Sequence, residues 1–217
     1  MKRMHWLKPT VFALCLLPLG LLVRKGFGGE LGANPIEVIT HSTGLWTLTF
    51  LLVTLSITPL RKLSGQLWLI RFRRMLGLFA FFYGSLHLLT YFWLDKFFDF
   101  HDIWKDIYKR PFITVGFTAF VLMIPLAVTS TRGWIRRLGG KRWNLLHKMI
   151  YASATAGVIH FWWLVKKDIS QPAEYAAVLS VLLGYRLTKW GWDTASKRNP
   201  KPAATRPIAE LADESGD

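Results

Sequence analysis

Three histidines stand in strongly apolar stretches of the sequence, and their imidazoles are the side chains best suited to chemistry there. His87 lies in FFYGSLHLLTYF, His147 in NLLHKMIY and His160 in TAGVIHFWWL. An ionisable side chain inside a membrane is costly and usually marks a functional site. Neutral imidazole is also a common ligand of heme iron. The three residues are therefore candidate iron ligands of a membrane cytochrome.

Two of these histidines, His87 and His160, are predicted to lie at the same depth. Two apolar runs begin at Met75 and Met149, and both would cross a membrane in the same direction. His87 is twelve residues beyond Met75, and His160 is eleven residues beyond Met149. Facing helices could then offer both imidazoles to the two axial positions of one iron. In the alternative interpretation, each imidazole is a polar group hydrogen-bonded to a neighbouring helix.

The third histidine, His147, lies thirteen residues before His160. At a rise of about 1.5 Å per residue, that separation is roughly 20 Å along a helix, too far for ligation of the same iron. The position on the other run that mirrors His147 is Arg74. An arginine is a poor iron ligand but a good partner for a heme propionate. His147 would therefore serve a second heme nearer the cytoplasmic face or be something other than an axial ligand, and the spacing supports one bis-histidine heme better than two. His41 could ligate or stabilise a group at the outer surface, but we expect it to be hydrated, and His5 and His101 are expected to be solvated.

The elements that must carry these residues are membrane helices. Six runs lack Asp, Glu, Lys and Arg, and spans of about 17 to 23 residues can be drawn through them, close to the ~20 that cross a bilayer. The runs cover residues 9–23, 38–60, 75–94, 111–131, 149–165 and 175–185. They predict an all-α, polytopic membrane helical bundle with six transmembrane helices over residues 1–195. Residues 196–217 are predicted to form a polar, disordered tail.

The first run resembles a signal peptide, but we interpret it as a retained helix. No small-residue cleavage site follows Val23, where Arg24, Lys25 and Gly26 come next. Cys15 is the single cysteine, so the chain can form no internal disulfide and no cysteine-ligated cluster. We expect Cys15 to pack between helices.

The charge distribution predicts the orientation of the chain. Its 28 basic and 13 acidic residues give a net charge of +15, which in a soluble protein would suggest nucleic acid as a partner. With both termini in the cytoplasm, however, most basic residues fall on the inner side, and the outer segments hold as many acidic as basic residues. This is the pattern of the positive-inside rule, and it excludes nucleic acid in favour of membrane lipid.

One outer segment, DKFFDFHDIWKDIYKR at residues 95–110, combines aromatic residues with alternating charges. It predicts a short amphipathic helix that either lies at the membrane interface or forms a docking surface for a partner. Basic residues at the inner ends of the spans could bind heme carboxylates, lipid headgroups or a flavin phosphate. The chain has no glycine-rich nucleotide fingerprint, so its electrons must come from a separate reductase or a membrane quinol.

The stretch LAVTSTRGWIRRLGGKRWNLLHKMIY, residues 126–151, resembles the ferric-reductase-like transmembrane domain family. The resemblance rests on a Thr-Ser dipeptide, an arginine-rich inner loop, and then Trp143, Leu146, His147 and Tyr151 in order. Over residues 8–192 the chain is most similar to the heme-binding membrane subunits of bacterial methionine sulfoxide reductase systems within that family.

The resemblance implies a multi-pass cytochrome b of the bacterial inner membrane, with His87, His147 and His160 as heme ligands and with FMN as a second cofactor. Such a subunit takes electrons from a cytoplasmic flavin reductase or the quinone pool. It passes them to a periplasmic molybdopterin methionine sulfoxide reductase, which carries out the catalysis and so repairs oxidised periplasmic proteins. The alternatives are a stand-alone quinol or ferric reductase and a proton-coupled transporter. The second to fifth spans contain no Asp or Glu, which disfavours the transporter.

Overall fold

The computed structural model describes residues 6–165 and 167–198, and in this part of the chain all regular structure is helical. The α-helices are α1 (Leu7–Phe27), α2 (Pro35–Ser64), α3 (Ile70–Thr90), α4 (Phe100–Lys109), α5 (Pro111–Val128), α6 (Arg132–Leu146), α7 (Met149–Leu164) and α8 (Ser170–Arg198). A 3-10 turn, Leu67–Leu69, precedes α3, and a π-helical turn, Tyr91–Asp95, follows it. The chain divides into two compact units, one ending at Leu183 and the other beginning at Gly184.

Four of the described helical segments are long and apolar enough to cross a membrane: Leu7–Phe27, Pro35–Ser64, Leu67–Asp95 and Pro111–Val128. They coincide with the first four predicted runs, so the prediction of an all-α membrane protein is confirmed at that level. The fifth and sixth runs lie in α7, which has 16 residues, and in α8. Helix α8 continues through Arg198 and so includes residues 196–198 of the predicted tail. The rest of that tail, residues 199–217, lies outside the described residues, and so does His5.

Local sequence sets where several helices begin and end. The Asn34 side chain accepts the Glu37 N–H at 3.3 Å and caps α2, whose last residue is followed by Gly65 with a φ of 70°. In the same way, Asp99 accepts the Asp102 N–H at 3.1 Å and caps α4. Short polar side chains satisfy the free N–H groups of a first turn, and glycine adopts a left-handed conformation without strain. These residues therefore fix the connections between neighbouring spans.

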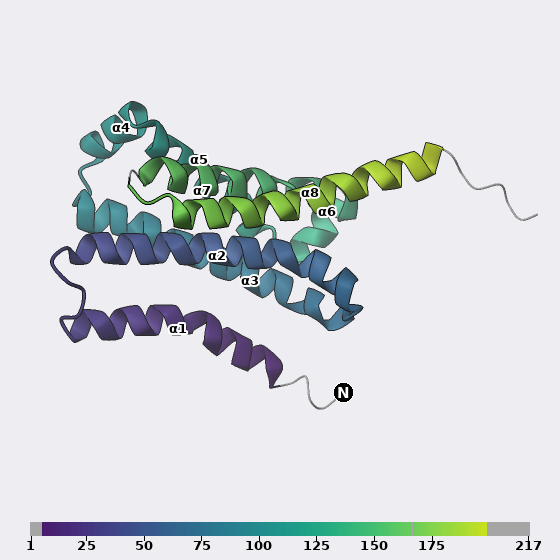
Figure 1. Cartoon of the computed structure of the whole chain (residues 1–217), viewed down its shortest axis with the longest axis horizontal. Coiled ribbons are helices and arrows are strands. Elements are labelled where there is room, and N and C mark those ends of the chain that lie inside the picture. The colour runs from purple at the N-terminus through teal and green to yellow at the C-terminus, as the bar shows by residue number, and fades with distance from the viewer. Residues whose placement is uncertain (1–5, 166, 199–217) are drawn as a thin grey trace, which may run out of the picture. The chain divides into compact units, whose positions relative to one another are not determined.

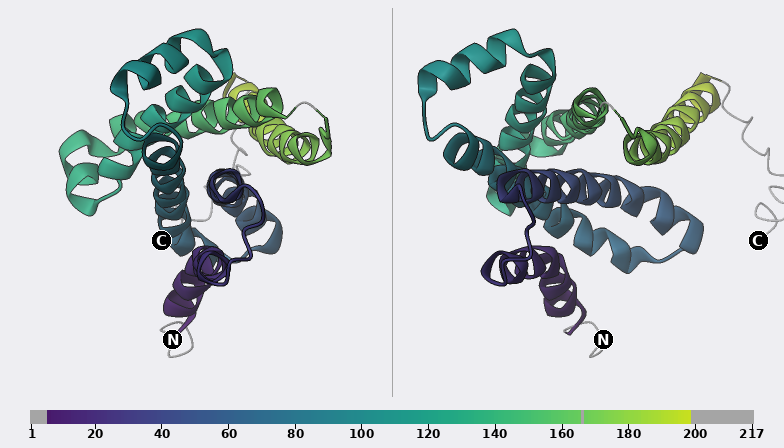
Figure 2. Two further views of the ribbon diagram at one scale, coloured as in Figure 1. Left: turned by 90° about the vertical axis from the view of Figure 1, so that its left-hand side faces the viewer. Right: turned by 60° about the vertical axis from the view of Figure 1, so that its left-hand side comes forward.

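The first unit is organised around two helix pairs (Figure 1). Helices α2 and α3 run side by side and share the most extensive contact, and α5 and α7 form the second pair. The α2–α3 pair lies between α1 and the α5–α7 pair (Figure 2). Helix α4 and the loop between α1 and α2 are at one end of this unit, and α6 and the turn between α2 and α3 are at the other (Figure 1).

Aromatic and aliphatic side chains of the central pair form the core. Tyr83 is 1% exposed, and its hydroxyl donates to the Cys15 carbonyl at 2.9 Å while it accepts the Leu19 N–H at 3.2 Å. The hydroxyl thus lies between a carbonyl and an N–H of the α1 backbone, next to Pro18, which has no N–H to donate. Cys15 is buried in the same cluster, as predicted. Many other apolar side chains of α1 are exposed, as expected for a helix whose outer face contacts lipid.

Candidate functional site

His87 of α3 and His160 of α7 come together from the two different helix pairs. Their ring centroids are 6.2 Å apart, and the ring planes are inclined by 74°. A metal–imidazole bond is about 2.0 Å long, so two imidazoles on opposite sides of one metal ion have centroids about 6 Å apart. The prediction that these two side chains meet is confirmed, and their distance matches that expected for two ligands of one metal ion, while the ligand role itself stays a prediction.

Both imidazoles are oriented by a backbone carbonyl of the neighbouring helix. His87 Nδ1 lies 2.9 Å from the Thr40 carbonyl oxygen of α2, and His160 Nδ1 lies 2.7 Å from the Phe112 carbonyl oxygen of α5. A carbonyl oxygen only accepts, so each Nδ1 carries the proton and each Nε2 carries the lone pair. Metal-binding histidines are held in the same way in proteins of many kinds. The donor set therefore fits an iron ligated through Nε2 on both sides.

The surroundings of this pair do not offer a site made of protein ligands alone. Among the residues described, no three His, Cys, Asp or Glu side chains are grouped closely enough to hold a metal ion. His41 is exposed and packs edge-on against Phe161, with ring centroids 5.9 Å apart. In a six-coordinate heme the macrocycle supplies the other iron ligands, so two histidines are enough from the protein.

His147 belongs to a separate cluster at the junction of α6 and α7. Its ring stacks on Trp143 at 3.9 Å between centroids, and its Nε2 lies 3.1 Å from the Thr129 hydroxyl. That hydroxyl donates to the Pro125 carbonyl at 2.6 Å, so it accepts the proton of Nε2. Trp143 donates its indole N–H to the Thr129 carbonyl at 2.9 Å. The motif residues that carry the family resemblance thus tie the end of α5 to α6 and α7.

The arginine whose charge acts on His147 is Arg73, while the role of Arg74 as a heme-propionate partner stays a prediction. Burial lowers the pKa of the His147 imidazole, and the nearby positive charge of Arg73 lowers it further. Arg73 is half-buried and Arg74 is exposed on α3. Adjacent residues on a helix point about 100° apart, so a match in depth along the helix does not select the residue that faces a partner.

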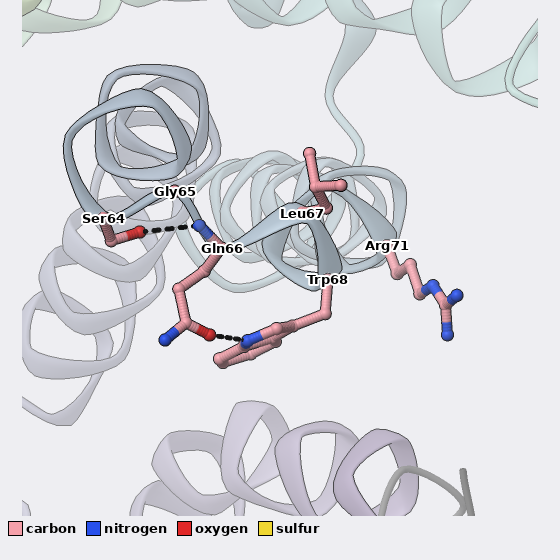
Figure 3. A pocket seen from close by; sticks show the side chains of 6 residues that line it. All are labelled: Ser64, Gly65, Gln66, Leu67, Trp68 and Arg71. Carbon is pink, nitrogen blue, oxygen red and sulfur yellow. Dashed lines mark hydrogen bonds between the residues drawn. The ribbon is translucent and has the colours of Figure 1, made fainter.

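The turn between α2 and α3 carries a hollow of about 510 Å³ at the same end of the first unit as α6. The Gln66 N–H donates to the Ser64 hydroxyl at 3.3 Å, and the Trp68 indole donates to the Gln66 side chain (Figure 3). The hollow is lined by Ser64, Gly65, Gln66, Leu67, Trp68 and Arg71. It combines an aromatic surface with a cation, and none of the candidate iron ligands lines it.

Comparison with known proteins agrees with these features. The family described as "Ferric reductase like transmembrane component" matches residues 41–158. The chain is 54% identical to "Protein-methionine-sulfoxide reductase heme-binding subunit MsrQ" of Herminiimonas arsenicoxydans over 89% of either chain. It is 51% identical to the protein of that name from Azospira oryzae, over 95% of this chain and 90% of the relative. No solved structure matches the chain.

Proposed function

This chain belongs to the MsrQ family of ferric-reductase-like heme-binding membrane subunits, and on that premise we propose that it is the cytochrome b subunit of a bacterial methionine sulfoxide reductase system. Heme b is held between His87 and His160 in the bacterial inner membrane. The observation that carries this proposal is the imidazole pair with a centroid distance of 6.2 Å. Two helix pairs of the bundle contribute one ligand each.

The residues of the chain bind and orient, and the substrate chemistry takes place in a partner. The bound heme supplies an iron that takes up and releases one electron at a time. The carbonyls of Thr40 and Phe112 accept the Nδ1 protons of the two imidazoles, which leaves both Nε2 lone pairs available to a metal. With His87 and His160 both as ligands, a bound heme would have no open position for oxygen. That property suits electron transfer.

We propose six transmembrane spans with both termini in the cytoplasm. Helix α7 has 16 residues, about 24 Å at 1.5 Å per residue, and it pairs with α5 along its length. The arginine-rich helix α6 and the turn between α2 and α3 share one end of the first unit (Figure 1). Basic segments remain on the cytoplasmic side, so this end is assigned to the cytoplasm. Helix α4 then faces the periplasm.

The periplasmic partner is proposed to be a molybdopterin methionine sulfoxide reductase, and α4 is proposed as its docking surface. Phe100, Trp104 and Tyr108 follow one another at intervals of four residues and are 69%, 74% and 85% exposed. Ile103 and Asp106 on the opposite side of α4 are buried. Exposed aromatic residues on a firmly held helix are typical anchors of protein interfaces. A partner bound at this end would use the delivered electrons to reduce methionine sulfoxide in oxidised periplasmic proteins.

Electrons are proposed to arrive from a cytoplasmic flavin reductase or the membrane quinone pool. FMN, which the family resemblance implies, would need a cation for its phosphate and an aromatic surface for its ring system. The hollow between α2 and α3 offers Arg71 and Trp68 for these roles at the proposed cytoplasmic end (Figure 3). The test is the flavin content of purified protein after Arg71→Ala, which should fall while the heme content stays constant.

The heme proposal is tested by optical spectra of the detergent-purified protein, with heme counted per polypeptide. We expect low-spin b-type bands in the wild type and their loss in His87→Ala and in His160→Ala. His101→Ala removes an exposed histidine and serves as the matched control. Retention of the low-spin bands in both single variants would rule out the bis-histidine site. Activity that persists after removal of the periplasmic partner would favour a stand-alone reductase.

A further inference from the structure

Each of the two imidazoles lies directly against a glycine of the neighbouring helix. A Cβ atom placed on Gly44 of α2 would come within 3.0 Å of His87 Nδ1 and Cε1. A Cβ atom placed on Gly116 of α5 would come within 2.6 Å of His160 Nδ1 and 2.9 Å of its Cγ. Carbon atoms in van der Waals contact lie about 3.5 to 4.0 Å apart, so neither position has room for a side chain next to the observed ring.

The two contacts are built in the same way. Gly44 follows Thr40 by four residues, and Gly116 follows Phe112 by four residues. Thr40 and Phe112 are the residues whose carbonyl oxygens accept the Nδ1 protons. Residues four apart in a helix lie one above the other on the same face. The carbonyl of a helical residue points toward the residue four positions later, so the Nδ1 edge of each imidazole lies against both its proton acceptor and the glycine.

We propose that Gly44 and Gly116 are positioning residues for His87 and His160, because the missing side chains let each ring approach the carbonyl that fixes its tautomer and orientation. The inference rests on the ligand roles proposed above. Within each helix pair, one helix carries the ligand and the other positions it. Helix α2 positions the histidine of α3, and α5 positions the histidine of α7. An axial imidazole is thus oriented before iron binds, which lowers the entropic cost of ligation.

The alanine variants test this positioning role through the spectrum and the reduction potential of the bound heme. Gly116→Ala should lose part of the low-spin signal and raise the midpoint potential of the remainder, because a displaced ring loses the Nδ1 hydrogen bond that makes it a stronger donor to ferric iron. Gly44→Ala should show a smaller change, in line with its longer contact distances. Gly77→Ala on α3, where a Cβ would make an ordinary contact of 3.6 Å with Thr54, is the matched control.

A double-mutant cycle separates this role from simple helix packing. Gly116→Ala should lower the melting temperature of the purified protein in the wild-type background but not in His160→Ala, where no ring is left to collide with the new methyl group. If Gly116→Ala alone does not fold, the double variant should recover folded protein. An equal loss of stability in both backgrounds, or spectra and potential like those of Gly77→Ala, would overturn the proposal.

The same variants distinguish failure of this inference from failure of the heme proposal. Heme retained with unchanged bands in His160→Ala would contradict the ligand role. The stability coupling between Gly116 and His160 would still report whether the glycine positions the ring. Coupling close to zero in that cycle would overturn the positioning role whatever the spectra show.

Discussion

At the scale of single residues, an imidazole can bind a metal only through a nitrogen that carries a lone pair. His87 and His160 meet this condition at Nε2, since Nδ1 of each ring is engaged with a carbonyl oxygen. In His147, by contrast, Nε2 donates to the Thr129 hydroxyl, so the lone pair lies on Nδ1, and the ring face is covered by Trp143. The family resemblance implies a ligand role for His147 as well, so the difference in hydrogen bonding can be tested.

The variant His147→Ala is expected to retain the full heme content while it destabilises the protein. It loses a hydrogen bond and an aromatic contact, together worth about 1–3 kcal/mol. Thr129→Val should show a similar loss, because it removes the acceptor of the same hydrogen bond. The measurements are heme per polypeptide and the melting temperature, with His101→Ala as the exposed control. A heme content that falls by half would instead assign a second heme to His147.

At the scale of elements, α4 is held to the rest of the first unit by a cluster of charged groups. Lys96 lies 2.7 Å from a carboxylate oxygen of Asp102 and 2.7 Å from one of Asp106, and Arg110 approaches Asp106 at 3.4 Å. Tyr91 donates its hydroxyl proton to Asp106 at 3.3 Å. Asp106 is 7% exposed, so its carboxylate depends on these partners for stabilisation.

Replacement of Lys96 by methionine should therefore loosen α4. We expect a loss of about 1–3 kcal/mol, which is typical when a buried polar group loses a charged partner. Lys105→Met removes an exposed lysine of the same helix and should change little. Protease cleavage between residues 95 and 110 reports the loosening. Equal cleavage rates in the two variants would show that the Lys96 cluster does not anchor α4.

Acid should weaken the same cluster. The Lys96 ammonium lowers the pKa of the Asp102 carboxyl, mainly through their hydrogen bond. A carboxyl with a lowered folded-state pKa contributes stability above its ordinary value of about 3.9, and that stability is lost as the pH falls through the lowered value. Protease cleavage of this segment should accordingly rise only below about pH 4. A rise near neutral pH would point to a different anchoring group.

The outer face of α4 should govern contact with the periplasmic partner. Trp104→Ala or Tyr108→Ala should weaken binding by about tenfold or more, the effect of an interface anchor, with unchanged heme spectra. Phe27→Ala at the end of α1 is the control, because Phe27 is 92% exposed and lies on a different element. Binding of the purified subunits measures the effect. Wild-type affinity in both α4 variants would place the docking surface elsewhere.

At the scale of the whole molecule, the number of spans decides which side of the membrane each loop faces. In a Cys15→Ser background, a cysteine at Ser170 should react with an impermeant maleimide in spheroplasts. A cysteine at Ser64 or Lys141 should react only after permeabilisation. Labelling of positions 170 and 141 from the same side would contradict a transmembrane α7 and, with it, the proposed six-span topology.

The sequence by itself determined the membrane class, the helical architecture and the depth of the candidate ligands. Apolar runs of bilayer length and the position of a residue along a run are properties of the linear chain. Composition and spacing therefore sufficed to predict that His87 and His160 meet. The same reasoning could not identify Gly44 and Gly116, because an ordinary helical glycine and one that faces a ring look alike in sequence.

Only the tertiary structure decided which faces of the helices meet. A helix that is apolar on all sides carries no signal for its rotation about its own axis, and a shift of one residue turns a side chain by about 100°. Packing of α2 on α3 and of α5 on α7 set that rotation. It placed the Thr40 and Phe112 carbonyls against the two imidazoles, and it brought the charge of Arg73 close to His147.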